Sequence, residues 1–265
     1  MSNVVIPPIL RNKRTWAKSV FTPSALLREA RRQKELDDVE APPVCILDPD
    51  GDLARRLRQT GVSKPFAGWP CYHTELDIFE LGGHRVGIIG RVVGAPFATL
   101  VAEELFTSGC KLLINLTSAG QIIPTGQPPY FVIIDKALRD EGTSYHYAAP
   151  SDFAQAQPRL VATARTALAE CGLNGIVGAS WTTDAPFRET AQAIEAARRE
   201  NIVAVEMEAA ALYAFAQAKQ RAVLCLAHVT NTMAQIEGDF EKGEADGARD
   251  ALRVLSAIVR RLAPK

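Results

Sequence analysis

The stretch IVAVEMEAAALYAFAQ, residues 202–217, decides the fold of this chain. A β-branched apolar run stops at two acids around a methionine and passes directly into an alanine-rich segment that favours helix. This order predicts a parallel strand that delivers Glu206 and Glu208 to its carboxyl end, where α/β proteins bind ligands. Residues two apart in a strand point the same way, so we expect both carboxylates on one side and Met207 on the other. Two such acids can bind vicinal hydroxyl groups, although carboxylates also favour the positive end of a following helix.

The rest of the chain alternates apolar runs with helical patterns. Continuous apolar runs, typical of strands covered on both faces, occur at 44–47, 86–89, 112–116, 130–134, 175–179, 202–205 and 223–229. Helical periodicity lies at 53–59, 96–107, 158–169, 189–200, 208–219 and 243–262. This alternation predicts an α/β fold, a three-layer α/β/α sandwich with a mixed, largely parallel central sheet. Pro96 suits a first helical position, so that helix should begin just past Gly94.

One main domain is expected, because no proline-rich or serine-rich linker divides the chain after residue 40. We therefore assign residues 41–265 to this domain and residues 1–40 to an N-terminal helical extension. Within the extension, PSALLREARRQKE at 23–35 predicts a solvated helix that packs outside the core. A functional arm that reaches a neighbouring subunit is the alternative.

Composition indicates a small-molecule partner. Lys and Arg total 30, as do Asp and Glu, without long blocks of one sign, which disfavours nucleic-acid and membrane partners. No apolar run reaches the ~18 residues of a membrane span, and no apolar core follows the N-terminal charges as in a signal peptide. The five cysteines lie far apart and indicate reduced thiols in a cytoplasmic protein. The histidines show no metal-ligand spacing and the glycines no dinucleotide fingerprint, so no metal or cofactor is predicted.

Three motifs carry a family resemblance. Besides residues 202–217, EGTSYHYAAP at 141–150 is similar to a D-G-A-S-x-H-F-A-P loop, and GAPFATLVAEEL at 94–105 is similar to a G-G-P-S-x-x-x-x-x-E-E-L helix entry. In this order they resemble the nucleoside phosphorylase family, and within it most of all the uridine phosphorylases. The resemblance implies an enzyme of nucleoside metabolism that cleaves the N-glycosidic bond of a nucleoside or related ribosyl compound. It also implies a homo-oligomer, dimer or hexamer.

Cleavage of this bond requires groups that bind the ribose hydroxyls, a group that stabilises the leaving base, and a nucleophile that attacks the cationic sugar. The resemblance implies ribose binding by Glu206, Met207 and Glu208. Glu208 is the candidate catalytic acceptor of the 2′ and 3′ hydroxyls, and Met207 packs under the sugar. Carboxylate acceptors bind more strongly as positive charge develops on the sugar, so Glu208 should act mainly on the transition state.

The segment SWTTDAPFRET, residues 180–190, stands where the family binds the base. Trp181 could stack on the base, and Asp184 or Arg188 could read its polar edges. A surface loop capped by nearby threonines is the alternative.

Two further candidates lie elsewhere in the chain. Asn231 stands near the place of the acid that helps the leaving group in purine-cleaving relatives; it can hydrogen-bond a base but is no useful proton donor. Asp239 could fold back into this site, or belong to a polar loop. His146 matches the family's loop near the sugar, although a lone loop histidine is more often structural.

The acceptor site departs from the family pattern. The positions that hold phosphate in phosphorylases carry no arginine here; they are Pro49, Leu53, Tyr72 and Asn115. The acids of 48–52 oppose phosphate by about 1–4 kcal/mol per close pair. Arg91, Ser118, the Gly120 amide and the helix start at Pro96 could form another anion pocket, which keeps phosphate possible as a co-substrate.

Two alternatives follow from the missing arginines. Asp50 or Asp52 could activate water in a phosphate-independent nucleoside hydrolase, if burial raises the pKa of the carboxylate. Turn formation is the structural explanation of the same acids. The other alternative is a non-catalytic relative that binds a nucleoside.

Overall fold

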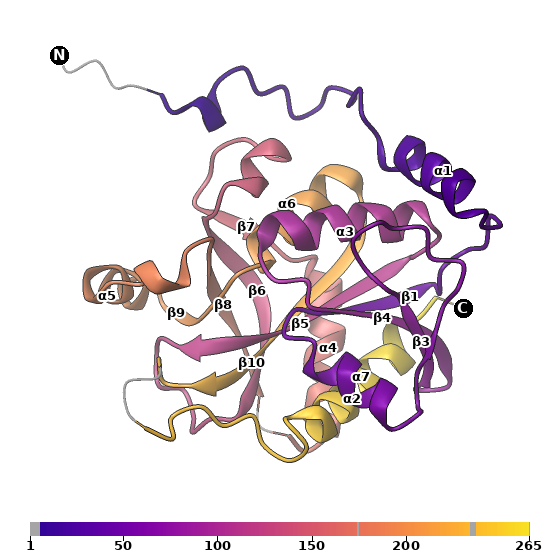
Figure 1. Ribbon diagram of the computed structural model, residues 1–265. Coiled ribbons are helices and arrows are strands. Elements are labelled where there is room, and N and C mark those ends of the chain that lie inside the picture. Colours follow the sequence, from indigo (N-terminus) through magenta and orange to yellow (C-terminus); the bar gives the residue numbers. More distant parts are fainter. Residues whose placement is uncertain (1–5, 174, 234–236, 265) are drawn as a thin grey trace.

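A mixed sheet with helices on both faces forms the protein (Figure 1). The structure is a computed structural model that describes residues 6–173, 175–233 and 237–264. The strands are β1 (Val44–Asp48), β2 (Lys64–Pro65), β3 (Asp77–Leu81), β4 (His84–Gly90), β5 (Leu112–Gln121), β6 (Tyr130–Asp140), β7 (Phe153–Gln155), β8 (Gly175–Thr183), β9 (Ile202–Glu206) and β10 (Ala222–Asn231). The helices are α1 (Pro23–Lys34), α2 (Asp52–Gln59), α3 (Ala95–Thr107), α4 (Pro158–Glu170), α5 (Ala191–Arg199), α6 (Ala209–Lys219) and α7 (Ala248–Leu262), with short 3-10 turns η1 (Pro8–Leu10), η2 (Thr143–His146) and η3 (Pro186–Arg188).

Two parallel sets of strands make up the sheet. Strands β1, β4, β5 and β10 pair in parallel, and so do β6, β8 and β9. The two sets meet in the antiparallel pairs β10–β6 and β5–β9. The predicted mixed α/β fold is confirmed, with more antiparallel pairing than expected. Because β5 and β9 meet near their carboxyl ends, Gly120 pairs with Val205, and the strand ends of both sets lie side by side.

Helices cover the sheet as the continuous apolar strands predict. Helices α3 and α6 lie on one face, over a core that includes Leu105, Leu212 and Phe215. Helices α2, α4 and α7 lie on the other face, as Figure 1 shows, over a core that includes Leu57 and Leu255. In the described residues no helix is long and apolar enough to cross a membrane.

The expected strands and helices are present, but several of them begin or end at residues other than the expected ones. Strands β5 and β10 extend past their apolar runs to Gln121 and Asn231, which carries polar side chains into the core region. The sequence pattern predicted β4 but missed its hairpin partner β3, because β3 alternates buried and less buried residues over only five positions. Helix α7 begins at Ala248 rather than at residue 243, because Gly247 adopts a left-handed conformation and ends a loop.

The predicted N-terminal helix is confirmed as α1. The Thr22 hydroxyl caps it by accepting a hydrogen bond from the Ala25 amide at 3.3 Å. Leu27 and Ala30 are fully buried, and α1 contacts α3, so one face of this helix is covered. The division of the chain at residue 40 stays a prediction.

Tyr213 joins α6 to the sheet. Its hydroxyl donates to the Ile134 carbonyl at 2.6 Å and accepts from the Cys225 amide at 3.0 Å, all within the core. We expect Tyr213→Phe to lower the free energy of unfolding by about 1–3 kcal/mol, because both backbone groups lose a buried partner. Urea unfolding measures this change. Tyr145→Phe, which removes a half-buried hydroxyl 3.2 Å from the Arg139 carbonyl, is the control with a smaller expected loss. Equal losses in the two variants would contradict the prediction.

Candidate active site

Glu208 lies where β9 passes into α6, at the carboxyl end of the strand. It is 1% exposed, and one carboxylate oxygen accepts the Gly94 amide at 2.7 Å, across 114 residues of sequence. The other oxygen has no hydrogen-bond partner among the described residues. Gly94 has φ +92°, a conformation that a residue with a Cβ rarely adopts, so glycine is needed where this amide meets the acid. Glu208 therefore has a free acceptor atom, which a sugar reaches only if neighbouring groups move.

Glu206 has a different environment. Its carboxylate accepts the hydroxyls of Ser180 and Thr182 and the amides of Glu208 and Ala209, both at 2.7 Å. These bonds hold the first turn of α6, as an acid at a helix N-terminus does. The chain turns into the helix after Glu206, so the strand alternation that placed both acids on one side ends there. Four donors of the protein thus bond to Glu206, and its predicted role in ribose binding stays a prediction.

The two glutamates titrate as neighbours in a buried region. Burial, together with the charge of Glu206, raises the pKa of Glu208 to about 8. Burial also raises the pKa of Glu206, against the donors that surround it. Neither acid forms an ion pair with a residue in the described ranges. Both shifts favour the protonated form of the acids.

This shift predicts how stability depends on pH. A carboxyl whose pKa is raised on folding binds its proton more tightly when folded, so its contribution to stability falls as pH rises between 4.5 and about 8. The unfolding free energy of the wild type, measured relative to that of Glu208→Gln, should therefore fall as pH rises, by up to about 1.4 kcal/mol per pH unit. Urea titrations at pH 5, 6, 7 and 8 measure it. A difference that is constant with pH would show that Glu208 titrates normally.

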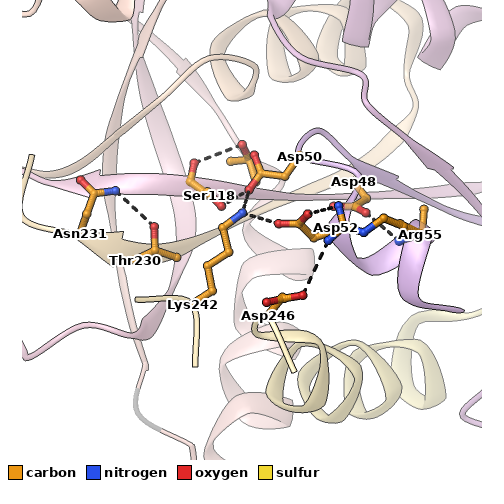
Figure 2. Close-up of polar contacts among 11 residues, drawn as sticks. Asp48, Asp50, Asp52, Arg55, Ser118, Thr230, Asn231, Lys242 and Asp246 are labelled. Carbon is orange, nitrogen blue, oxygen red and sulfur yellow. Dashed lines mark hydrogen bonds and ion pairs between the residues drawn. The ribbon is translucent and has the colours of Figure 1, made fainter. Parts of the chain in front are cut away.

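An acidic cluster with one lysine lies at the start of α2 (Figure 2). The Ser118 hydroxyl, on β5, donates to Asp50, and Lys242 donates to Asp50 at 2.7 Å and to Asp52. Arg55 pairs with Asp52 at 2.7 Å. Lys242 stands 192 residues from Asp50 in the sequence, in the polar loop before α7. Sequence reasoning missed it, because a lysine in a polar loop carries no signal of its partners.

The cluster changes the expected roles of the acids. Burial would raise the pKa of Asp52, but Lys242 and Arg55 outweigh it, and the pKa is lowered. Asp52 is therefore an ionised partner of two cations and does not match the predicted base of raised pKa. Burial raises the pKa of Asp48 to about 6, and Asp48 accepts the Ala54 amide at 2.8 Å. Asp50 shares Lys242 with Asp52 and, unlike Asp52, also accepts the Ser118 hydroxyl of β5.

Asn231 lies beside Gly120 at the ends of β10 and β5. Its amide group donates to the Thr230 hydroxyl at 3.2 Å, and its carbonyl oxygen accepts the Met233 amide at 2.9 Å. A Cβ on Gly120 would lie 2.7 Å from the Met233 sulfur, so this close approach needs glycine. The pairing of β10 with β5 thus brings Asn231 to Gly120, two residues from Ser118.

Asp239 folds back toward β10. Its carboxylate accepts the Thr232 amide at 2.9 Å and the Thr232 hydroxyl at 2.7 Å. It therefore holds the turn that follows the strand, next to a bridge between Asn231 and Phe240.

The segment of residues 180–190 ends in an exposed turn before α5, and the Thr190 hydroxyl caps this helix by accepting the Ala193 amide at 3.3 Å, as the alternative interpretation of a capped surface loop describes. Trp181 is 4% exposed in a core cluster, and its indole N–H donates to Asp140 at 3.0 Å. This buried position corrects its assignment as a base-stacking residue, because the ring packs in a core cluster that includes Ile202 and Val205. Arg188 is exposed on η3, and Asp184 accepts the Gly142 amide at 2.9 Å.

His146 and Arg91 are the two remaining residues of the predicted site. His146 lies on η2, and its Nδ1 is 2.9 Å from the Lys13 ammonium of the N-terminal arm. Burial, followed by the Lys13 charge, lowers the pKa of His146. Arg91 lies over Gly51 and lines a cavity with Arg55 and His73, so it does not join Ser118 in the predicted anion pocket. Among the described residues no group of acids, histidines and cysteines has the arrangement of a metal site.

The protein has a layered α/β fold, and its buried acid, Glu208, follows β9 where the two parallel sets of strands meet. A family model described as the phosphorylase superfamily matches residues 43–262. The chain belongs to the phosphorylase superfamily, as the three motifs predict. The predicted enzyme class is thereby confirmed at the level of the family.

Similar sequences agree with this family. A DeoD-type purine nucleoside phosphorylase of Roseobacter denitrificans is 29% identical over 184 residues, which cover 67% of this chain and 74% of that protein. One of Dichelobacter nodosus is 26% identical over 144 residues, 52% of this chain and 59% of that protein. The latter match thus spans less than two thirds of the relative's length.

Solved structures share the fold. A purine nucleoside phosphorylase of Toxoplasma gondii has a TM-score of 0.72 at 18% identity and covers 87% of this chain and 93% of its own. A 5′-methylthioadenosine/S-adenosyl homocysteine nucleosidase of Campylobacter jejuni has a TM-score of 0.69 at 15% identity, with coverage of 84% and 100%. A uridine phosphorylase of Vibrio fischeri has a TM-score of 0.69 at 19% identity, with coverage of 83% and 90%.

Proposed function

We propose that the protein cleaves the N-glycosidic bond of a nucleoside or related ribosyl compound, and that Glu208 accepts hydrogen bonds from the ribose hydroxyls. The observation that carries this proposal is the unpartnered, buried oxygen of Glu208 beside the Gly94 amide. A buried acceptor without a donor is costly, so a hydroxyl that enters this position is bound strongly. Met207, half-buried beside Glu208, supplies an apolar contact for the sugar.

Water is the acceptor that the acidic cluster favours. Asp48, Asp50 and Asp52 share one loop, and the two cations that contact Asp52 are Lys242 and Arg55. Phosphate placed there would meet repulsion of about 1–4 kcal/mol per close acid. Asp50 instead accepts the Ser118 hydroxyl and can take a proton from a water molecule at the same edge of the sheet.

Base release with and without phosphate tests the acceptor. Purified protein is incubated with a panel of purine and pyrimidine nucleosides, and free base and sugar product are identified by chromatography. Hydrolysis gives free ribose at the same rate with or without phosphate. Release that requires phosphate and yields ribose 1-phosphate would establish phosphorolysis instead. Ligand-induced thermal stabilisation with no turnover would support the nucleoside-binding relative without activity.

We also propose that the protein is a cytoplasmic homo-oligomer, a dimer or hexamer, that acts on small molecules rather than on nucleic acid or membranes. Tyr72, where the family lends a residue to a neighbouring site, is 43% exposed and its hydroxyl donates to Gln33 at 2.8 Å. Light scattering that shows a monomer at micromolar concentration would reject the oligomer.

A further inference from the structure

A second cavity lies on the other side of the β1–α2 turn from the acidic cluster. Its volume is about 570 Å³, within the range of small-molecule sites. The first turns of α2, the end of β4 and the loop after Cys71 enclose it. The arginines that line it are Arg55, Arg58 and Arg91, the acids are Glu75 and Asp77, and His73 lies beside them.

The charges of this cavity do not cancel. Arg58 forms ion pairs with both acids, with Asp77 at 2.6 Å and with Glu75 at 2.7 Å. Arg55 is held by Asp52, which points to the acidic cluster rather than into the cavity. Arg91 makes no ion pair with any residue of the described ranges. An unpaired guanidinium beside two fixed ones matches a ligand with more than one negative charge.

The chain itself fixes Arg91 at this place. Its amide donates to the Asp48 carbonyl at 2.9 Å, and its side chain crosses Gly51, where a Cβ would lie 2.6 Å from the Arg91 Cγ. Gly51 has φ +79°, so both the turn and the close approach need glycine. The guanidinium is thus directed over the turn that separates the cavity from the acidic cluster.

The cavity reaches the start of α3, because Phe97 lines it, and Gly94, whose amide binds Glu208, is the N-cap residue of the same helix. Arg91 precedes by three residues Gly94, whose amide binds Glu208, so their Cα atoms are at most about 10 Å apart. A ribose held at Glu208 by its 2′ and 3′ hydroxyls has its 5′ substituent on the opposite edge of the ring. A phosphate group on this substituent carries about −1.5 to −2 charges near neutral pH, which matches the unpaired arginine.

We propose that this cavity binds the phosphate group of a phosphorylated substrate, so that a nucleoside 5′-monophosphate is cleaved in preference to the nucleoside. This inference rests on the proposed function and adds the substrate class. Arg91 is the residue that selects the phosphorylated compound, with Arg55 and His73 as neighbours. Inorganic phosphate shares the same chemistry and is the other ligand that could occupy the cavity.

The test is the ratio of kcat/KM for a monophosphate to kcat/KM for its nucleoside, measured by base release without added phosphate. We expect the wild type to favour the monophosphate, and Arg91→Ala to lower the ratio about 10- to 100-fold, mainly through KM, because a charged hydrogen-bond partner is lost. Arg165→Ala, which removes an exposed arginine on α4 outside the cavity, is the matched control and should keep the ratio. Thermal unfolding of each variant confirms that it is folded.

The other possible results distinguish a failure of this inference from a failure of the proposed function. Nucleosides cleaved with no preference for the monophosphate, or a ratio that Arg91→Ala leaves unchanged, would overturn this inference and leave the proposed function intact. Inorganic phosphate that accelerates nucleoside cleavage in the wild type but not in Arg91→Ala would assign the cavity to a co-substrate and also overturn it. No base release from any compound would reject the proposed function itself.

Discussion

Glu208→Gln is expected to lower kcat for base release by about 10²–10³-fold, with a smaller effect on KM, because one charged acceptor at the cationic transition state is lost. The amide keeps the size of the side chain, but it replaces one acceptor oxygen by a donor. The Gly94 amide contact at 2.7 Å also loses its ionic partner. Steady-state kinetics with the best nucleoside or nucleotide measures both constants.

The pH profile separates this role from a structural one. Burial raises the pKa of Glu208 to about 8, so wild-type kcat/KM should rise with pH through this range as the carboxylate forms. Glu208→Gln should lack this limb. Glu206→Gln is the comparison: it removes acceptors of buried donors and should destabilise the protein. A Glu208→Gln enzyme with wild-type kcat, or with the wild-type pH limb, would exclude Glu208 from the chemical step.

Asp50→Asn should reduce phosphate-independent base release by about 10²–10⁴-fold, the usual contribution of a general base. The amide retains a bond to Ser118 but cannot take a proton from water. Its ammonium partner Lys242 also loses the contact at 2.7 Å, although it keeps Asp52. Rates of free ribose formation at saturating substrate measure the effect.

Asp246→Asn is the matched control for this prediction. Asp246 is an exposed acid of the same cluster, 3.7 Å from Arg55, and it does not contact Ser118 or Lys242 in the described structure. We expect Asp246→Asn to form free ribose at nearly the wild-type rate. If Asp246→Asn and Asp50→Asn lose activity equally, the cluster acts through its total charge and Asp50 is no base.

Most of the fold could be predicted from sequence, because the apolar runs are continuous and the helical patterns between them are periodic. The run before Glu206 became β9 and the alanine-rich segment became α6. The short β3, which alternates buried and exposed positions, gave too weak a pattern. Residues 243–247 continued a helical pattern but form a loop, since Gly247 takes a left-handed conformation that starts α7 later.

The site was predicted in part. The motif located Glu208 at the end of β9, because the position of a residue along a strand fixes the edge of the sheet at which it lies. The meeting of Gly120 with Asn231 depends on the pairing of β5 with β10. The prediction for Trp181 was wrong for a related reason. The edge of the sheet at which it lies was predicted correctly, but its segment is polar and partly aromatic, so the sequence did not show on which face of the strand the ring lies.

The sequence by itself determined the layered α/β fold, the family, and the acid at the end of β9, because periodicity and a local motif are properties of neighbouring residues. Tertiary structure alone decided that Glu206 is bound by four donors while Glu208 keeps a free oxygen. It alone joined Lys242 to Asp50 and left Arg91 unpaired in a cavity. Hydrogen bonds and ion pairs act over a few ångströms in space, and residues nearly 200 positions apart meet only when the sheet has brought their strands together.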